Sequence, residues 1–359
     1  MKKATKNSIL SFKDELHARP YIKLGNNLRT FHFAYLIKEN DENKNLNYLD
    51  KFLRKINFQK LPKEASKYWV AEGKDLIVRY ECHTEFISLT LIYPNKIDSV
   101  KNKPKLFEEN FLKLLPIEFL KKFPGHHFLS TWIEMVPSNF HFRPIDIEEF
   151  FNHDNFAGSN VAEDGANVFM SFKSDRTNFL ESGFRRVFIQ NKNLRTRRTG
   201  RLLQRIVELE TYQVLSLLGL PQVRQETLNL SNLEKQITEI TKSVSKTAKK
   251  NLNKKSIIHT DYQKDLNELS YVVAKIEEID SSTNYRLSAT AAYYKLVEQR
   301  IHDLREERLE SFQTNYEFLS RRLQPAIRTS EAFSRRLESL ATRAQRADNL
   351  VRTQIEMGV

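Results

Sequence analysis

The residues that could do chemistry gather first in FKDELHARP, which runs from Phe12 to Pro20. Asp14, His17 and Arg19 lie close together there, and carboxylate, imidazole and guanidinium groups can transfer protons and bind anions. The same stretch also suits a short helix that Ser11 caps and the final proline stops. Those local rules leave the imidazole unexplained, so His17 and Arg19 are candidate site residues.

A second polar group lies in HTEF, which begins at His83. In a strand, His83 and Glu85 would share one face and could bind a metal ion or relay a proton, or they form an ordinary polar strand face. No H-E-x-x-H or C-x-x-C spacing occurs here or in GHH at 125–127, so no metal site is predicted. Cys82 lies in an apolar run, which favours an inert buried thiol.

The strongest local charge lies between Arg185 and Arg201, where seven basic residues occur with no acid. The candidate anion-binding residues are Arg195, Arg197, Arg198 and Arg201. Three interpretations stay open: a nucleic-acid patch, a patch for anionic lipid, or the solvated end of a hairpin and first turn of a helix. No aromatic residue interleaves 195–201, which weakens the idea of stacking on single-stranded bases.

The composition indicates a chain rich in helices. The 359 residues are 40% hydrophobic and 29% charged, and they carry a net charge of +13. That charge suits nucleic acid, anionic lipid or an acidic protein partner. With only 9 glycines and 1 cysteine, glycine-rich phosphate loops are disfavoured and a reducing compartment is favoured. No secretory signal and no apolar stretch of about 20 residues occurs, so no membrane crossing is predicted.

The first half of the chain predicts an α+β domain, 1–194, with a mainly antiparallel sheet. Its strand-like segments are rich in aromatic and β-branched residues. The expected strands are 30–38, 67–94 as two strands around a turn with a break near His83, 127–137, 166–173 and 184–193, and the expected helices are 45–58, 105–123 and 146–151.

The second half, 195–359, predicts a helical, coiled-coil-like domain. Apolar residues recur every three or four positions over 202–218, and Gly219 with Pro221 should end that helix. Further helices are expected at 228–250, at 262–279 and from Ser282, and Pro325 should kink or restart the last one.

From Phe312 to Val351 the core-type positions alternate steps of four and three, which is a heptad seam. The seam either packs against other helices of the same chain or forms a coiled coil between subunits. The second interpretation predicts a homo-oligomer.

Five blocks together resemble a known bacterial family. They are DELHARP (14–20), HTEF (83–86), GRLLQRIVELETYQVLSLLGLP (200–221), YRLSATAAYYKLVEQRIHDLREER (285–308) and FLSRRLQPAIRTSEAFSRRLESLATRAQRADNLVRTQIE (318–356). In this order the chain resembles the family designated domain of unknown function 3422, often labelled putative membrane-anchored proteins. The resemblance covers nearly the whole chain and implies no catalytic residues or cofactor.

Two departures limit what the resemblance implies. Where the family pattern has an acid-containing strand, this chain has MSFK at 170–173, so no role for that acid is carried over. Family members are also expected to continue into a hydrophobic tail, whereas this sequence stops at Val359, so the membrane anchor is not inherited. An α/β domain followed by long helices is similar to the plan of CorA-type magnesium channels, which is an analogy of architecture only.

These observations lead to three hypotheses. The first is a non-enzymatic, cytoplasmic protein that self-associates through long helices and lies at the inner face of a bacterial membrane. The second is a nucleic-acid-binding protein that uses the arginines of 195–201. The third is an enzyme or metal-binding protein that uses His17, Arg19, His83 and Glu85, although no motif names a reaction or a cofactor.

Overall fold

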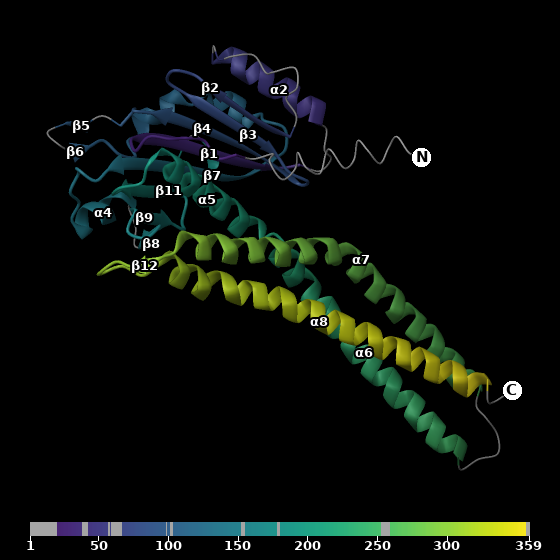
Figure 1. Ribbon diagram of the computed structural model, residues 1–359. Coiled ribbons are helices and arrows are strands. Elements are labelled where there is room, and N and C mark those ends of the chain that lie inside the picture. Colours follow the sequence, from purple (N-terminus) through teal and green to yellow (C-terminus); the bar gives the residue numbers. More distant parts are fainter. Residues whose placement is uncertain are drawn as a thin grey trace, which may run out of the picture. The chain divides into compact units, whose positions relative to one another are not determined.

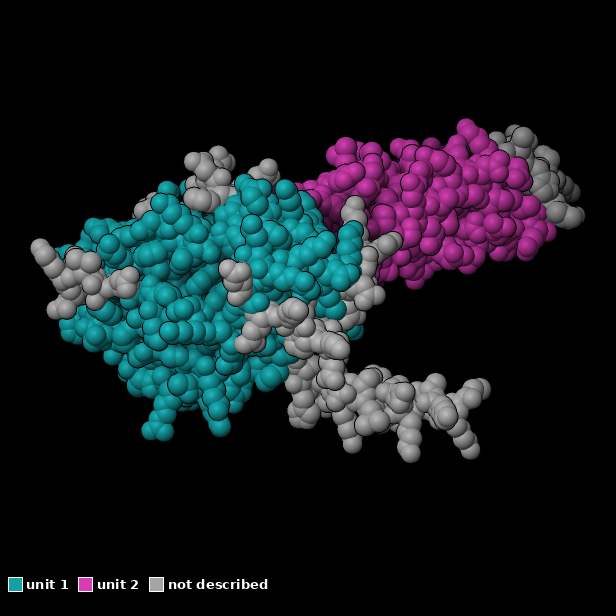
Figure 2. Space-filling view, turned by 90° about the horizontal axis from the view of Figure 1, so that it is seen from above, with its two compact units in different colours: residues 1–214, 297–319 teal, residues 215–296, 320–359 magenta. Residues whose placement is uncertain are grey.

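A computed structural model describes residues 20–37, 42–56, 58, 67–97, 99–100, 103–151, 155–177, 180–252 and 259–356. The chain divides into two compact units, coloured separately in Figure 2: unit 1 comprises 1–214 and 297–319, and unit 2 comprises 215–296 and 320–359. These units differ from the expected division into 1–194 and 195–359. The change of composition near residue 195 marks the start of a helix that belongs to unit 1 up to Val214.

Unit 1 is an α+β structure built on a ten-stranded sheet (Figure 1). Along the sheet the strand order is β12-β8-β9-β11-β7-β1-β4-β3-β2, and β10 pairs with β11. Among the described strands only β11 and β7 pair in parallel. The bounds are β1 Leu28–Leu36, β2 Tyr68–Glu72, β3 Ile77–Cys82, β4 Phe86–Pro94, β7 His126–Pro137, β8 Phe156–Val161, β9 Ala166–Ser171, β10 Asp175–Thr177, β11 Leu180–Asn191 and β12 Glu307–Arg308, with a separate pair β5 Ser99–Val100 and β6 Lys103–Pro104.

The two faces of this sheet differ because side chains alternate along each strand. In β1, Phe31, Phe33 and Tyr35 belong to the main apolar core, while Thr30 and His32 lie on the opposite face. The apolar face packs against α2 (Glu42–Lys55), the 3₁₀ helix η1 (Glu109–Leu114), α3 (Ile117–Lys121) and α4 (Pro144–Phe151). The polar face packs against α5 (Thr196–Leu215). The ring of His32, for example, forms a hydrogen bond with the Thr211 side chain of that helix.

Several elements differ from the expectation at their ends or in kind. The predicted helix 105–123 is instead η1 followed by α3, because Pro116 cannot donate a backbone hydrogen bond and Leu115 is extended before it. The break near His83 is confirmed, since β3 ends at Cys82 and β4 begins at Phe86. The predicted strands do not include β5, β6, β8, β10 or β12.

The helical half consists of fewer and longer helices than expected. α6 runs from Leu220 to Leu252, so it begins eight residues before the predicted start at Leu228 and takes Pro221 into its first turn, where proline is well tolerated. α7 is one helix, His259–Leu304, without a new start at Ser282. α8, Asn315–Glu356, continues through Pro325.

From Phe333 onward the heptad seam of α8 packs inside unit 2. Its buried residues join a core with apolar residues of α6 and α7, listed here: Phe333, Leu337, Leu340, Ala344, Ala347 and Val351 of α8, Leu230, Leu233, Ile237 and Ile240 of α6, and Leu269, Val272, Ile276 and Ile279 of α7. This packing favours the intramolecular interpretation of the seam. In the described part of the chain, no helix is both long and apolar enough to span a membrane.

A candidate anion-binding site lined by arginines

A pocket of about 210 Å³ in unit 1 is lined by four arginines, Arg198, Arg201 and Arg205 of α5 and Arg305 just after α7. The three arginines of α5 share one face because they are spaced by three and four residues. The remaining lining residues are Ala162, Glu163, Leu202 and Asp303. Four cations therefore face two acids in one half-open pocket.

The start of α5 is fixed by the turn that leaves β11. The side chain of Asn191 accepts a hydrogen bond from the amide of Leu194 (2.8 Å) and donates one to the Thr199 hydroxyl (3.2 Å). That hydroxyl also donates to the carbonyl of Arg195 at 3.2 Å. All of Asn191 and Thr199 is buried, so this network sets where the helix begins and where its arginines point.

The chain before β1 crosses the first turns of α5. The amide of Leu24 donates to the carbonyl of Thr196 at 3.1 Å, and the Tyr68 hydroxyl donates to the carbonyl of Pro20 at 3.0 Å. The crossing needs glycine in the helix, because a Cβ at Gly200 would lie 1.7 Å from the carbonyl oxygen of Ile22. The segment thereby brings Tyr21 next to Arg201.

The four guanidinium groups are held by different partners. Arg198 donates to the carbonyl of Ala162 at 2.7 Å and to Glu163 at 3.4 Å. Arg305 forms a close ion pair with Glu163, and Arg205 donates to the carbonyl of Asp303 at 3.0 Å.

Arg201 differs from these three. Its guanidinium lies 5.1 Å from the centre of the Tyr21 ring, and among the described residues no hydrogen bond or ion pair engages it. Its N–H donors are therefore free to bind a ligand.

The turn between β8 and β9 forms another wall of the pocket. Ala162, Glu163 and Asp164 all have positive φ angles, of 58–59°, which is uncommon for residues with a side chain. The amide of Ala162 donates to the carbonyl of Leu304 (2.9 Å), and Asp164 pairs with Lys192. These bonds hold Glu163 between Arg198 and Arg305.

Such a pocket can bind a small anion. Planar guanidinium groups match the oxygens of phosphate or carboxylate groups, and attraction strengthens where water is partly excluded. No group of three or more His, Cys, Asp or Glu side chains suited to a metal ion occurs among the residues that the structure describes.

A buried polar layer between the sheet and α5 supports this site. His32 is 1% exposed, and its ring nitrogens lie 2.9 Å from the hydroxyls of Thr90 and Thr211. Burial, with a smaller contribution from Arg79, lowers the pKa of His32 to about 3, so the ring is neutral at ordinary pH.

Glu210 of α5 also belongs to this layer. It accepts hydrogen bonds from Gln213 at 2.6 Å, Arg185 at 3.4 Å and Thr131 at 3.5 Å. Burial raises the pKa of Glu210, and the positive charge of Arg185 opposes that rise. This layer holds α5 in a fixed rotation, because a rotated helix would leave these polar groups buried without partners.

The predicted site residues fall in three places. His17 and Arg19 lie outside the described residues. His83 and Glu85 lie in the turn between β3 and β4, so the expectation that they share a strand face is wrong. The turn is closed by a bond from the amide of His83 to the carbonyl of Phe86 (2.8 Å), and the two rings stack with centres 4.0 Å apart.

Of the four predicted arginines, Arg198 and Arg201 line the pocket, whereas Arg195 and Arg197 are exposed residues outside its lining. Sequence reasoning missed Arg205 and Arg305. The helical spacing from Arg198 and Arg201 could have indicated Arg205, since it continues their face. No local signal marks Arg305, which arrives from the far end of α7.

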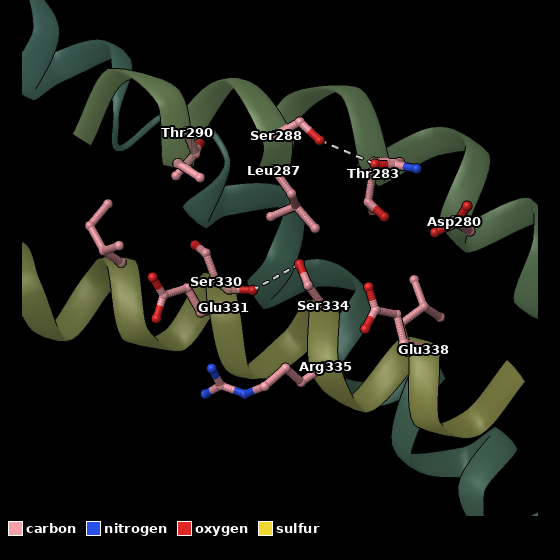
Figure 3. Close-up of a pocket in the computed structure, with 14 residues that line it drawn as sticks. Asp280, Thr283, Leu287, Ser288, Thr290, Ser330, Glu331, Ser334, Arg335 and Glu338 are labelled. Carbon is pink, nitrogen blue, oxygen red and sulfur yellow. Dashed lines mark hydrogen bonds between the residues drawn. The ribbon is translucent and has the colours of Figure 1, made fainter. Parts of the chain in front are cut away.

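A second pocket, of about 380 Å³, lies between α7 and α8 within unit 2 (Figure 3). Its hydroxyl groups are mostly engaged by their own helices. Thr283 donates to the carbonyl of Ile279 at 2.7 Å, and Ser334 donates to that of Ser330 at 3.3 Å. Hydroxyls that bond to their own helix in this way are an ordinary feature of packed helices, so they do not indicate a ligand site. Arg335 extends from α8 on the side away from α7 (Figure 3).

The chain is an α+β protein. It has a mixed sheet with an arginine-lined pocket in unit 1, and three long helices in unit 2. Residues 10–359 match the family described as Protein of unknown function (DUF3422), and the chain therefore belongs to that family. No curated protein and no solved structure matches the chain.

Proposed function

We propose that this protein is a non-enzymatic module that binds phosphate-bearing lipid headgroups at the inner, cytoplasmic face of a membrane. The observation that carries the proposal is the pocket in which Arg198, Arg201, Arg205 and Arg305 meet. A volume of about 210 Å³ is small for a drug-sized ligand and suits a compact anion such as one phosphate group.

The surroundings of the pocket favour a charged surface. Arg195, just before α5, and Arg197 in its first turn are exposed, and each basic residue close to an anionic membrane adds about 1 kcal/mol of attraction. The net charge of +13 adds long-range attraction of the same sign.

Nucleic acid is the competing ligand, and the pocket favours it less. Single-stranded binding uses aromatic faces on which bases stack. The aromatic ring at this pocket is Tyr21, and the guanidinium of Arg201 already covers its face.

The test is flotation of the full chain with vesicles of phosphatidylglycerol and phosphatidylcholine at low salt. The protein should float with anionic vesicles and ignore pure phosphatidylcholine. Arg201→Glu should lose binding by about tenfold or more, because it places an acid where the headgroup would lie. Arg224→Glu, an equal change of charge at an exposed position of α6, is the matched control and should bind like the wild type.

Two outcomes of the flotation experiment count against lipid binding. Equal flotation of Arg201→Glu and the wild type, or no flotation of the wild type, would contradict the proposal. A single-stranded RNA oligonucleotide serves as a second probe. Binding of RNA that depends on Arg201, without vesicle binding, would replace the lipid proposal with the nucleic-acid one.

A further inference from the structure

A groove runs between α6 and α7 in unit 2. Two adjoining pockets of about 430 and 490 Å³ form it, and Gln236 and Tyr271 line both. The Tyr271 residue is 57% exposed although it is large and aromatic. The floor is apolar and buried, and consists of Leu233, Ile240, Val272 and Ile279.

The groove is negatively charged. Four acids line it, Glu226 and Glu239 of α6 and Glu268 and Glu278 of α7. Lys275 is the one base among the lining residues, and it forms an ion pair with Glu278 at 2.6 Å. Glu268 also lies 3.8 Å from Lys264, which is outside the lining, so the lining keeps a net negative charge. An acidic groove with an apolar floor and an exposed tyrosine suits a basic helix.

α8 carries a matching stripe of arginines, defined here as Arg321, Arg328, Arg335 and Arg346. Spacings of seven, seven and eleven residues place them on one face of a helix. All four are exposed, and within the described residues none has a hydrogen bond or an ion pair. The seam of α8 that packs in the core lies nearly opposite on the helix, as the direction of Arg335 in Figure 3 illustrates.

We propose that the arginine stripe of a second copy of this chain occupies the α6–α7 groove. The charges are complementary, and a guanidinium can stack on the ring of Tyr271. The lengths are comparable: Glu226 to Glu239 spans about 20 Å along α6, and along α8 Arg335 to Arg346 spans about 17 Å and Arg328 to Arg346 about 27 Å.

This contact is heterologous, because the stripe and the groove are different surfaces of one chain. Each copy offers one of each, so copies associate head to tail and either close into a ring or continue as a chain. The interface joins charged groups at its rim, so association should weaken as salt increases. It does not depend on the arginine pocket of unit 1.

The test uses two variants of the full chain and light scattering after size exclusion at low salt. The stripe variant carries Arg328→Glu, Arg335→Glu and Arg346→Glu, and the groove variant carries Glu226→Lys, Glu239→Lys and Glu268→Lys. Each variant alone should associate about tenfold or more weakly than the wild type. An equimolar mixture should recover association, because each altered surface then meets its opposite charge.

A matched control carries Lys51→Glu, Lys113→Glu and Lys122→Glu at exposed positions of unit 1, with the same change in charge as the stripe variant. It should associate like the wild type. A monomeric wild type, a stripe variant that associates normally, or a mixture that stays monomeric would each overturn the proposal. If only vesicle binding is lost in the stripe variant, the stripe contacts lipid and the proposal fails.

Discussion

His32 shows how a single residue can hold the site in place without belonging to it. Its ring bridges Thr90 of the sheet and Thr211 of α5 from a fully buried position. A neutral imidazole donates one of these hydrogen bonds and accepts the other, whereas a protonated ring would only donate. The helix that carries the arginines is thus attached to the sheet through a side chain that must stay neutral.

This requirement predicts a dependence of stability on pH. The pKa of His32 is lowered to about 3 in the fold, while an unfolded histidine titrates near 6.5. The stability that the neutral His32 ring contributes is therefore fully present above about pH 6.5. It is lost as the pH falls toward 3, by about 3 kcal/mol at pH 4.5. His32→Gln, which cannot titrate, should lose less stability over that range.

The measurement is urea unfolding at pH 7.5 and pH 4.5, followed by tryptophan fluorescence. Both tryptophans, Trp69 and Trp132, lie in unit 1, so the signal reports the unit that contains His32. His141→Gln, at an exposed position, is the control and should behave like the wild type. Equal losses in the wild type and His32→Gln would show that this imidazole does not govern the acid sensitivity.

Gly200 is a second residue whose identity the fold demands. Adding a Cβ there would drive it into the backbone carbonyl of Ile22, so Gly200→Ala should destabilise unit 1 by about 2 kcal/mol or more. At Gly25 nothing lies within 4 Å of an added Cβ, so Gly25→Ala should be neutral or slightly stabilising. The urea midpoints of unfolding measure both effects. Equal midpoints for the two variants would contradict the close approach of Ile22 to Gly200.

Among single residues, the sequence predicted two of the four arginines that line the pocket. Arg198 and Arg201 stood out because they lie in a dense basic run. Arg305 did not, because the fold brings it to α5 from about a hundred residues further along the chain. His83 and Glu85 were assigned a shared strand face, yet the turn after Cys82 interrupts the alternation on which that prediction depended.

At the scale of elements, strands with strong alternation were predicted well and weakly patterned ones were not. β1, β7, β9 and β11 contain aromatic and β-branched residues whose period of two survives in the sheet. β8, FAGSNV, contains small and polar residues with low strand propensity, and it forms because both its edges pair. Pairing with β9 and β12 makes this segment a strand, and the local sequence pattern does not contain that information.

The two prolines of the helical unit make a matched pair for testing element stability. Pro325 lies inside α8, where proline removes a backbone hydrogen bond, whereas Pro221 lies in the first turn of α6. Pro325→Ala should therefore stabilise unit 2 by about 1–3 kcal/mol. Pro221→Ala should gain nothing. Thermal unfolding followed by helical circular dichroism measures both, and a larger gain at Pro221 would contradict this account of the helices.

At the scale of the whole molecule, basic groups are organised differently in the two units. In unit 1, arginines from separate segments converge on one pocket. In unit 2, arginines follow one face of a single helix at helical spacings. The first arrangement suits a compact anion and the second suits an extended acidic surface, so the two proposals can fail independently.

The central claim is that the arginine pocket binds a phosphate group, and the most direct test uses a soluble headgroup analogue. Unfolding of the full chain is followed by tryptophan fluorescence as glycerol 1-phosphate replaces chloride at constant ionic strength. A ligand that binds only the folded protein stabilises it by about 2.7 kcal/mol at a hundredfold excess over its Kd. The account predicts such stabilisation in the wild type and Arg224→Glu, and its loss in Arg201→Glu. No stabilisation of the wild type, or equal stabilisation of Arg201→Glu, would contradict it.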